Sequence, residues 1–263
     1  MMKKENILWG IILVILGIMF LLNTMGILSF NVWKLFWPVA LILLGLWFLV
    51  GAVFFKQLPT EAVSIPLDGI QRAKISLQHG AGALKLSSGA SAQELAAGDF
   101  VGGVDYDVQR SGDEALVVFN APSYPVSSWT GFSDGLKWDI RLNPAPDLDL
   151  NLKTGASESH LNLTELQVSQ IQLSTGASAA TILMPAQCAF TKARIEGGAT
   201  SIEIRIPENV AARIQFEGGL VNMKVDQSRF PQTGEFYASP NYEQSDWKTE
   251  IYITGGVGSI RIV

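Results

Sequence analysis

The amino-acid sequence predicts an all-β repeat domain preceded by a two-helix transmembrane hairpin. Two observations lead to this fold class. The N-terminal region contains two long apolar runs without charge, and the rest of the chain repeats short alternating segments around regularly spaced glycines. Internal repeats of this size are typical of stacked architectures. We place the hairpin in residues 1–61 and the β-repeat domain in residues 62–263.

The two apolar runs are long enough to cross a bilayer as helices. No charged residue lies between Asn6 and Trp33 or between Leu35 and Phe55. A helix needs about 20 apolar residues to cross about 30 Å of hydrocarbon. We therefore predict spans over residues 7–28 and 35–55. A secretory signal peptide is the alternative, but the first run is long, no A-x-A site follows it, and a second run comes almost at once.

Charged and aromatic residues near the ends of these spans predict the orientation of the hairpin. Lysines flank both outer ends, whereas the short connection offers only Lys34, so the positive-inside rule places the β domain in the cytoplasm. This describes a multi-pass membrane protein, which in a bacterium would lie in the inner membrane. The residues expected to anchor the hairpin at the interface are Lys3, Lys4, Trp9, Trp33, Trp37 and Lys56.

The charge of the remaining chain excludes several partners. Beyond residue 61 there are 15 Lys and Arg against 22 Asp and Glu, a net charge of −7. An acidic domain without a basic stripe is a poor ligand for nucleic acid or anionic lipid, and we expect neither. The single cysteine, Cys188, excludes an internal disulfide, and beside Phe190 it has the pattern of a small core residue.

Glycines mark the repeat. Gly155, Gly176, Gly197 and Gly218 are spaced by 21 residues, and each follows a segment that alternates apolar and polar residues. Period-two alternation predicts a half-buried strand, and the glycine predicts a tight turn or a close backbone approach. Related segments occur early, as AKISLQHGAG, and last, as EIYITGGVG.

A second alternating strand follows each turn, as in HLNL, TILM and SIEIRI. A unit of two short strands cannot bury its own apolar face, so the repeats must stack. The domain is therefore predicted to be a β-solenoid or a rack of stacked sheets. In the repeat LSTGASAATILMP, Ser178 should be a turn residue, and Ile182 and Met184 should point into the core.

No residues combine into a catalytic, cofactor or metal site. Ser157 and Ser178 lack a G-x-S-x-G elbow, and the chain has only His79 and His160 as bases. The glycine turns lack the P-loop pattern.

Two acidic patterns allow weaker alternatives. The pairs Asp105/Asp107 and Asp147/Asp149 could bind a hard cation, but a solvated strand face explains them better. Glu196 and Glu217 are expected at matching places in neighbouring coils.

Two insertions interrupt the repeat, at residues 119–138 and 227–247. The first is rich in Pro, Ser and Gly with aromatic residues between them, and the second delays the final repeat. Both carry aromatic residues, which suits partner-binding loops on a rigid scaffold. The alternative is that these aromatics fold back and cap the ends of the stack. The candidate binding residues are Trp129, Phe132, Phe230, Phe236, Tyr237, Tyr242 and Trp247.

Two stretches resemble known bacterial families. The segment WGIILVILGIMFLLNTMGILSFNVWKLFWPVALILLGLWFLV resembles the transmembrane region of LiaI- and LiaF-like proteins, with its Leu-Leu-Asn end and its Trp37–Pro38 opening. The repeats LNLTELQVSQIQLSTGASAATILMP resemble the toast-rack, or adhesin-type, β-repeat domain (DUF4097-like). The resemblance implies a membrane protein without catalytic activity, tied to cell-envelope stress. LiaF-like proteins restrain a two-component histidine kinase.

These observations favour a non-enzymatic, membrane-anchored β-repeat protein that acts as a scaffold or regulator in a bacterial envelope response. Its expected partners are the membrane, a membrane-bound sensor kinase or other envelope protein, and a second copy of itself. The alternative is an outward-facing structural or adhesin-like surface module. The side of the membrane on which the domain lies separates the two.

Overall fold

The computed structural model describes residues 37–38, 41–42, 45, 59–122 and 135–263. Its strands belong to one compact unit, and the five described residues before residue 59 are helical and belong to another. No described helix is long and apolar enough to cross a membrane. The predicted spans lie outside the described residues, apart from those five. Of the predicted anchors only Trp37 is described, and it is 62% exposed, whereas Lys3, Lys4, Trp9, Trp33 and Lys56 lie outside.

The predicted all-β domain is confirmed, because every element after residue 59 in the described chain is a strand. Most strands alternate buried and exposed residues, as the period-two pattern requires. The strands are β1 (Thr60–Pro66), β2 (Arg72–His79), β3 (Gly82–Ser88), β4 (Glu94–Val101), β5 (Asp105–Ser111), β6 (Glu114–Asn120), β7 (Leu136–Leu142), β8 (Asp147–Thr154), β9 (Ser157–Asn162), β10 (Val168–Leu183), β11 (Phe190–Arg205), β12 (Ala211–Val225), β13 (Gln232–Thr233), β14 (Phe236–Ala238) and β15 (Lys248–Ile262).

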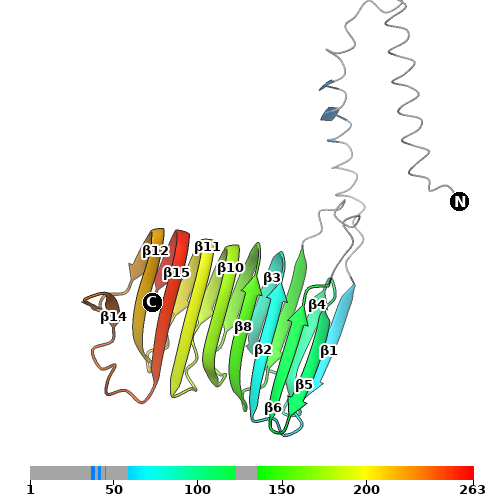
Figure 1. Ribbon diagram of the computed structural model, residues 1–263, viewed down its shortest axis with the longest axis horizontal. Coiled ribbons are helices and arrows are strands. Elements are labelled where there is room, and N and C mark those ends of the chain that lie inside the picture. The colour runs from blue at the N-terminus through cyan, green and yellow to red at the C-terminus, as the bar shows by residue number, and fades with distance from the viewer. Residues whose placement is uncertain (1–36, 39–40, 43–44, 46–58, 123–134) are drawn as a thin grey trace, which may run out of the picture. The chain divides into compact units, whose positions relative to one another are not determined.

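The long strands β10, β11, β12 and β15 each arch over near their middle (Figure 1). The first arm of β10 pairs with β8 and its second arm pairs with β9. We call one first arm, its arch and one second arm a layer, and the stack of layers the rack. The first arms form one sheet, ordered β5, β6, β2, β8, β10, β11, β15, β12, β14 and β13. The second arms form another, ordered β1, β4, β7, β3, β9, β10, β11, β15 and β12.

The layers do not stack in the order of the chain. The repeat that comes last, β15, lies between β11 and β12, with Ile253 paired to Ile195 on one side and to Phe216 on the other. At the other end, β2 lies between β6 and β8. The expectation that Glu196 and Glu217 occupy neighbouring coils is therefore wrong, because both pair with Thr254 of β15. Insertion gives β15 hydrogen-bonding partners on both edges.

A column of glycines runs through the arches and explains the repeated turn. A Cβ atom built on Gly155 would lie 2.8 Å from the carbonyl oxygen of Gly80, and one on Gly176 would lie 3.2 Å from that of Gly155. The contact continues through Gly198, Gly256 and Gly219, at 3.0, 2.7 and 2.9 Å. The layers thus approach too closely at the arch for any side chain. The glycine turn is therefore what allows the layers to stack this closely.

The 21-residue spacing does not identify equivalent glycines throughout the rack. Gly197 pairs with Thr175, so the partner of Gly176 in the column is Gly198. The two adjacent glycines of the sequence EGGAT make these registers indistinguishable by spacing alone. The correct glycine is the one whose α-carbon faces the carbonyl of the layer beside it.

Aliphatic side chains from both sheets fill the space between them. Ile182 and Met184 are fully buried, as predicted, and Ser178 is half-buried next to the arch. The prediction for Cys188 is wrong, because Cys188 is partly exposed in the turn before β11 and Phe190 is 45% exposed. The alternating pattern continues through Phe190, but this residue points away from the core.

Candidate interaction surface

Four of the predicted binding aromatics pack against the end of the rack. Phe230 is fully buried and Tyr242 is 6% exposed, so neither offers a contact surface in this structure. Phe236 and Tyr237 are half-buried in β14, which pairs antiparallel with the first arm of β12. These four aromatics follow the capping alternative, because the insertion that contains them covers the end of the first-arm sheet.

The other three candidates have different surroundings. Trp129 and Phe132 lie outside the described residues. Trp247 is 37% exposed at the start of β15, and its carbonyl accepts a hydrogen bond from the amide of Ala211 at 2.9 Å. Trp247 therefore combines a fixed backbone with an accessible ring, as a contact residue requires.

A cluster around Arg213 fixes the cap to the rack. Its guanidinium carbon lies 4.4 Å from the ring centre of Tyr242 and 5.4 Å from that of Phe236. The same guanidinium pairs with Glu243 and lies 3.6 Å from the Glu250 carboxylate. Burial, together with the Glu250 charge, raises the pKa of Tyr242. The phenol stays protonated and donates to Glu250 Oε1 at 3.1 Å.

The serines and histidines do not form a catalytic arrangement. Ser157 is buried with Ser159 as its neighbour at 3.4 Å, and Ser178 shares a hydrogen bond with Thr175. His160 pairs with Glu158 on the same exposed strand face. No described histidine bonds to either serine, so both serines act as turn and packing residues.

His79 is a buried polar residue that the sequence did not explain. It is 2% exposed, and its ring meets that of Trp138 edge to face, with centres 5.1 Å apart. Within the described residues, neither imidazole nitrogen has a partner at hydrogen-bonding geometry. Burial lowers the pKa of His79, an effect that the nearby Leu136 backbone partly offsets. The neutral imidazole therefore belongs to the core.

The acidic pairs lie on solvated strand faces. Asp105 and Asp107 are exposed on β5, and Asp107 accepts a hydrogen bond from Gln109 at 2.9 Å. Asp149 pairs with Lys74 of the adjacent strand at 3.4 Å. Among the described residues, no group of three acidic, histidine or cysteine side chains could hold a metal ion.

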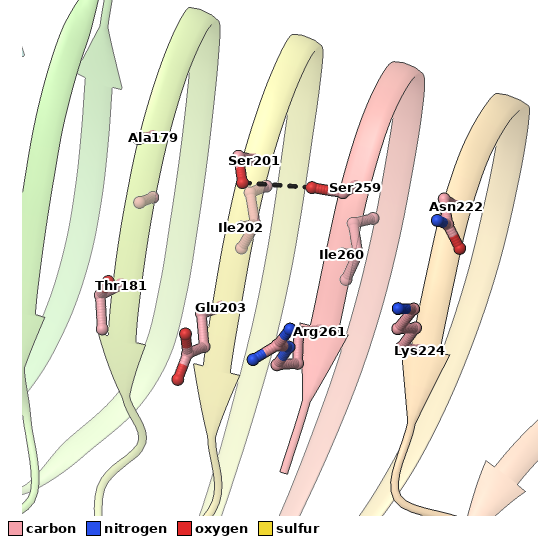
Figure 2. A pocket seen from close by; sticks show the side chains of 11 residues that line it. Ala179, Thr181, Ser201, Ile202, Glu203, Asn222, Lys224, Ser259, Ile260 and Arg261 are labelled. Atoms are coloured by element: carbon pink, nitrogen blue, oxygen red, sulfur yellow. Dashed lines mark hydrogen bonds between the residues drawn. The ribbon is translucent and has the colours of Figure 1, made fainter.

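A shallow groove crosses the outer face of the second-arm sheet, over β10, β11, β15 and β12 (Figure 2). Its volume is about 340 Å³. Short side chains form one row across the strands, and the Ser201 and Ser259 hydroxyls are hydrogen-bonded at 3.1 Å. The next row carries charges, with Arg261 between Glu203 and Lys224. The groove is polar and open, unlike the enclosed apolar pockets that hold small molecules.

The chain has an apolar N-terminal region followed in sequence by stacked layers of arched strands. These two features define its class, which is that of β-rack proteins with a membrane anchor. Residues 7–49 match the LiaI-LiaF-like transmembrane region. Residues 55–227 match the N-terminal domain of toast_rack, DUF2154, which is more than half of the chain. The chain therefore belongs to the toast_rack family, and the resemblance to both families is confirmed.

One solved structure supports the fold. A "putative cell adhesion protein" from Clostridium sporogenes ATCC 15579 is 21% identical, with a TM-score of 0.71 over 79% of this chain and 99% of that chain. A "putative adhesin" from Bacteroides fragilis NCTC 9343 is 7% identical, with a TM-score of 0.30 over 80% of this chain and 98% of that chain, and carries no argument here. No curated protein matches the sequence.

The sequence reasoning missed the groove and the end of the second-arm sheet beside it. The alternation in NMKV, residues 222–225, is the same as in SIEI and SIRI, so it shows only which side chains face the core. Whether a further strand covers them depends on the position of the layer in the rack. The one sequence feature that could have indicated the unusual place of the last layer is the long insertion at 227–247, which delays the last repeat.

Proposed function

We propose that this protein is a non-catalytic, membrane-anchored scaffold that regulates a bacterial cell-envelope response. The observation that carries the proposal is the match of residues 7–49 to the LiaI-LiaF-like transmembrane region, directly ahead of a rack whose first strand begins at Thr60. Such a segment anchors the chain in the membrane, where envelope proteins reside. The families that match are non-catalytic in kind.

The proposal assigns the domain to the cytoplasmic side, through the few lysines that flank the hairpin. From there it would contact a membrane-bound sensor kinase, the class of partner that the LiaF-like resemblance implies. Trp247 and the insertion that contains Trp129 and Phe132 are the proposed contacts. Their aromatic rings provide large contact areas at low entropic cost.

The second candidate is an outward-facing, adhesin-like surface module. The fold neighbour described as a "putative cell adhesion protein" favours this candidate, since the match covers nearly all of that neighbour's chain. At 21% identity the likeness concerns the fold alone. The two candidates place the rack on opposite sides of the membrane.

The only cysteine of the chain allows a direct test of orientation. Cys188 is partly exposed in the turn before β11. A membrane-impermeant maleimide applied to intact cells should leave Cys188 unlabelled and should label it after permeabilisation. A Cys188→Ser variant is the control for specificity. Labelling in intact cells would contradict the cytoplasmic assignment and support the adhesin-like module.

The regulatory role needs a separate experiment. Deleting the gene should change the activity of an envelope-stress promoter under cell-wall antibiotics, and the wild-type gene should restore it. A gene in which Trp129, Phe132 and Trp247 are all replaced by Ala should not restore the promoter activity, and its product should no longer co-purify with the kinase. Tyr106→Ala is the control for losing an exposed aromatic ring that is not a proposed contact, because Tyr106 is 49% exposed on β5. An unchanged promoter in the deletion strain would contradict the proposal.

A further inference from the structure

The second arm of β12 is an open strand edge. Its first arm pairs on one side with β15 and on the other with β14, through residues 213–215. Residues 218–225 pair with β15 alone among the described residues. The segment 226–247 therefore covers half of the end of the rack, and no strand of the described chain lies beside the other half. Unpaired strand edges are the sites at which a further strand is added in peptide recognition.

The core is also uncovered at this edge. Val221, Met223 and Val225 point inward and pack against the core, yet each remains half-exposed. The corresponding side chains of the neighbouring layer, Ile260 and Ile262, are 2% and 0% exposed. An added strand with apolar residues facing inward would bury the three β12 side chains in the same way.

The outer face of this edge is cationic, although the domain as a whole is acidic. Lys224 pairs in register with Arg261, and neither forms an ion pair within the described residues. The nearby Glu203 is neutralised by Arg205, whose Nε lies 2.7 Å from its carboxylate. The groove provides about 340 Å³ of space beside these cations, with the Ser259 hydroxyl and Asn222 amide at its floor (Figure 2).

Acidic residues lie only at the two ends of the open segment. Glu217 is exposed at the arch, before the segment begins. Asp226 follows its last residue, and the Ser228 side chain and amide donate to its carboxylate at 2.6 and 3.0 Å. Between these ends the inward side is apolar, and the outward side carries Leu220, which is 83% exposed, then Asn222 and Lys224. An occupant that matches both sides turns apolar residues inward and carboxylates outward, toward Lys224 and Arg261.

We propose that residues 218–225 of β12 bind an extended peptide segment of another protein, in which apolar residues alternate with acidic ones. The segment adds as a strand to the second-arm sheet. Its apolar side chains cover Val221, Met223 and Val225, and its carboxylates reach Lys224 and Arg261 in the groove. Backbone hydrogen bonds supply the register, and the arginine fork favours a carboxylate geometrically. This inference goes beyond the proposed function, because it holds on either side of the membrane.

Direct binding to the purified full chain in detergent tests the proposal. The probe is a short fluorescent peptide that alternates valine and glutamate, measured by anisotropy. It should bind about tenfold more tightly than the matched valine–lysine peptide, and the difference should shrink at high salt. A glutamate peptide with N-methylated valines should bind poorly, because it lacks the donors of a strand. Equal binding of all three peptides would overturn the proposal.

Charge reversal provides the sharpest control. Lys224→Glu should lower the affinity for the valine–glutamate peptide about fivefold, which is the scale of one exposed ion pair, and should raise the affinity for the valine–lysine peptide. Lys153→Glu makes the same change of charge on β8 of the other sheet and should alter neither affinity. Unchanged binding in the Lys224 variant would place the site elsewhere. A wild-type dimer in sedimentation that Lys224→Glu dissociates would identify a second copy as the occupant, against the proposal.

Discussion

The glycine column predicts that adding one methyl group at an arch destabilises the whole rack. In Gly155→Ala, the new Cβ would lie 2.8 Å from the carbonyl oxygen of Gly80, where ordinary contact begins at 3.4 Å. The layers must separate by the difference, 0.6 Å. The amide of Gly155 donates to that same oxygen at 3.0 Å and to the His79 carbonyl oxygen at 3.1 Å. A shift of 0.6 Å along the first bond would lengthen it to about 3.6 Å, beyond useful range.

The lost hydrogen bond and the strain together cost about 1–3 kcal/mol. For a domain of this size, the melting temperature should fall by about 2–12 °C. Thermal unfolding of the full chain in detergent, followed by far-ultraviolet circular dichroism, measures the effect. The loss should be smaller for Gly176→Ala, whose new contact is 3.2 Å, and larger for Gly256→Ala, at 2.7 Å.

Gly80→Ala is the matched control. A Cβ on Gly80 meets no described atom within 4 Å, and its φ lies outside the left-handed region. Alanine there should leave the stability unchanged, or raise it slightly by restricting the unfolded chain. If Gly80→Ala and Gly155→Ala were equally destabilising, the cost would come from losing glycine at the turn, and the argument from close approach would be refuted.

Three further predictions concern buried polar groups. Burial lowers the folded-state pKa of His79, so as the pH falls the unfolded chain takes up the proton first. The free energy of unfolding should therefore fall as the pH drops below about 6.5. In urea titrations, His79→Phe should reduce this dependence of stability on pH. Arg213→Ala should cost about 1–3 kcal/mol in the same titration at neutral pH, because it removes the cation beside Glu250 and above the Tyr242 ring. An unchanged midpoint would contradict the role of the Arg213 cluster. Thr191 and Thr249 are both 1% exposed and paired in register. Only the Thr191 hydroxyl has a partner, Val168 O at 2.8 Å, so Thr191→Val should destabilise by about 1 kcal/mol and Thr249→Val should not.

The strands and arches could be predicted because they follow from local patterns. Alternation at 148–152 and 171–173 identifies the buried face of each first arm, and glycine identifies the arch. The order of the layers could not be predicted in this way. Ala193, Ile251 and Ile214 occupy the same register position in three neighbouring layers and are all buried, so any of these layers could stack beside any other without changing the pattern.

The aromatic insertion shows a different limit. A sequence rich in Phe, Tyr, Pro and Ser fits both an exposed binding loop and a cap that folds back. Tyr242 is buried because its hydroxyl has Glu250 as an acceptor and its ring has Arg213 above it. These partners lie 8 and 29 residues away in the chain. Only the tertiary contact decides between the two interpretations, whereas the exposure of Trp247 leaves the binding interpretation open for that residue alone among the described candidates.

The insertion of β15 and the open edge of β12 are two aspects of one arrangement. At the position where the other long strands carry Ser178, Thr200 and Val221, β15 carries Gly258, with a φ of 148°. A Cβ on Gly258 would lie 1.9 Å from the carbonyl oxygen of Thr200 in β11. This glycine is needed because β15 lies against β11, so the sequence of the last strand is adapted to an interior position. That position displaces β12 to the end of the rack, where its second arm has no strand beyond it among the described residues. The open edge of β12 is therefore a consequence of where the last strand lies. A strand that binds there would extend the second-arm sheet by one strand beyond β12.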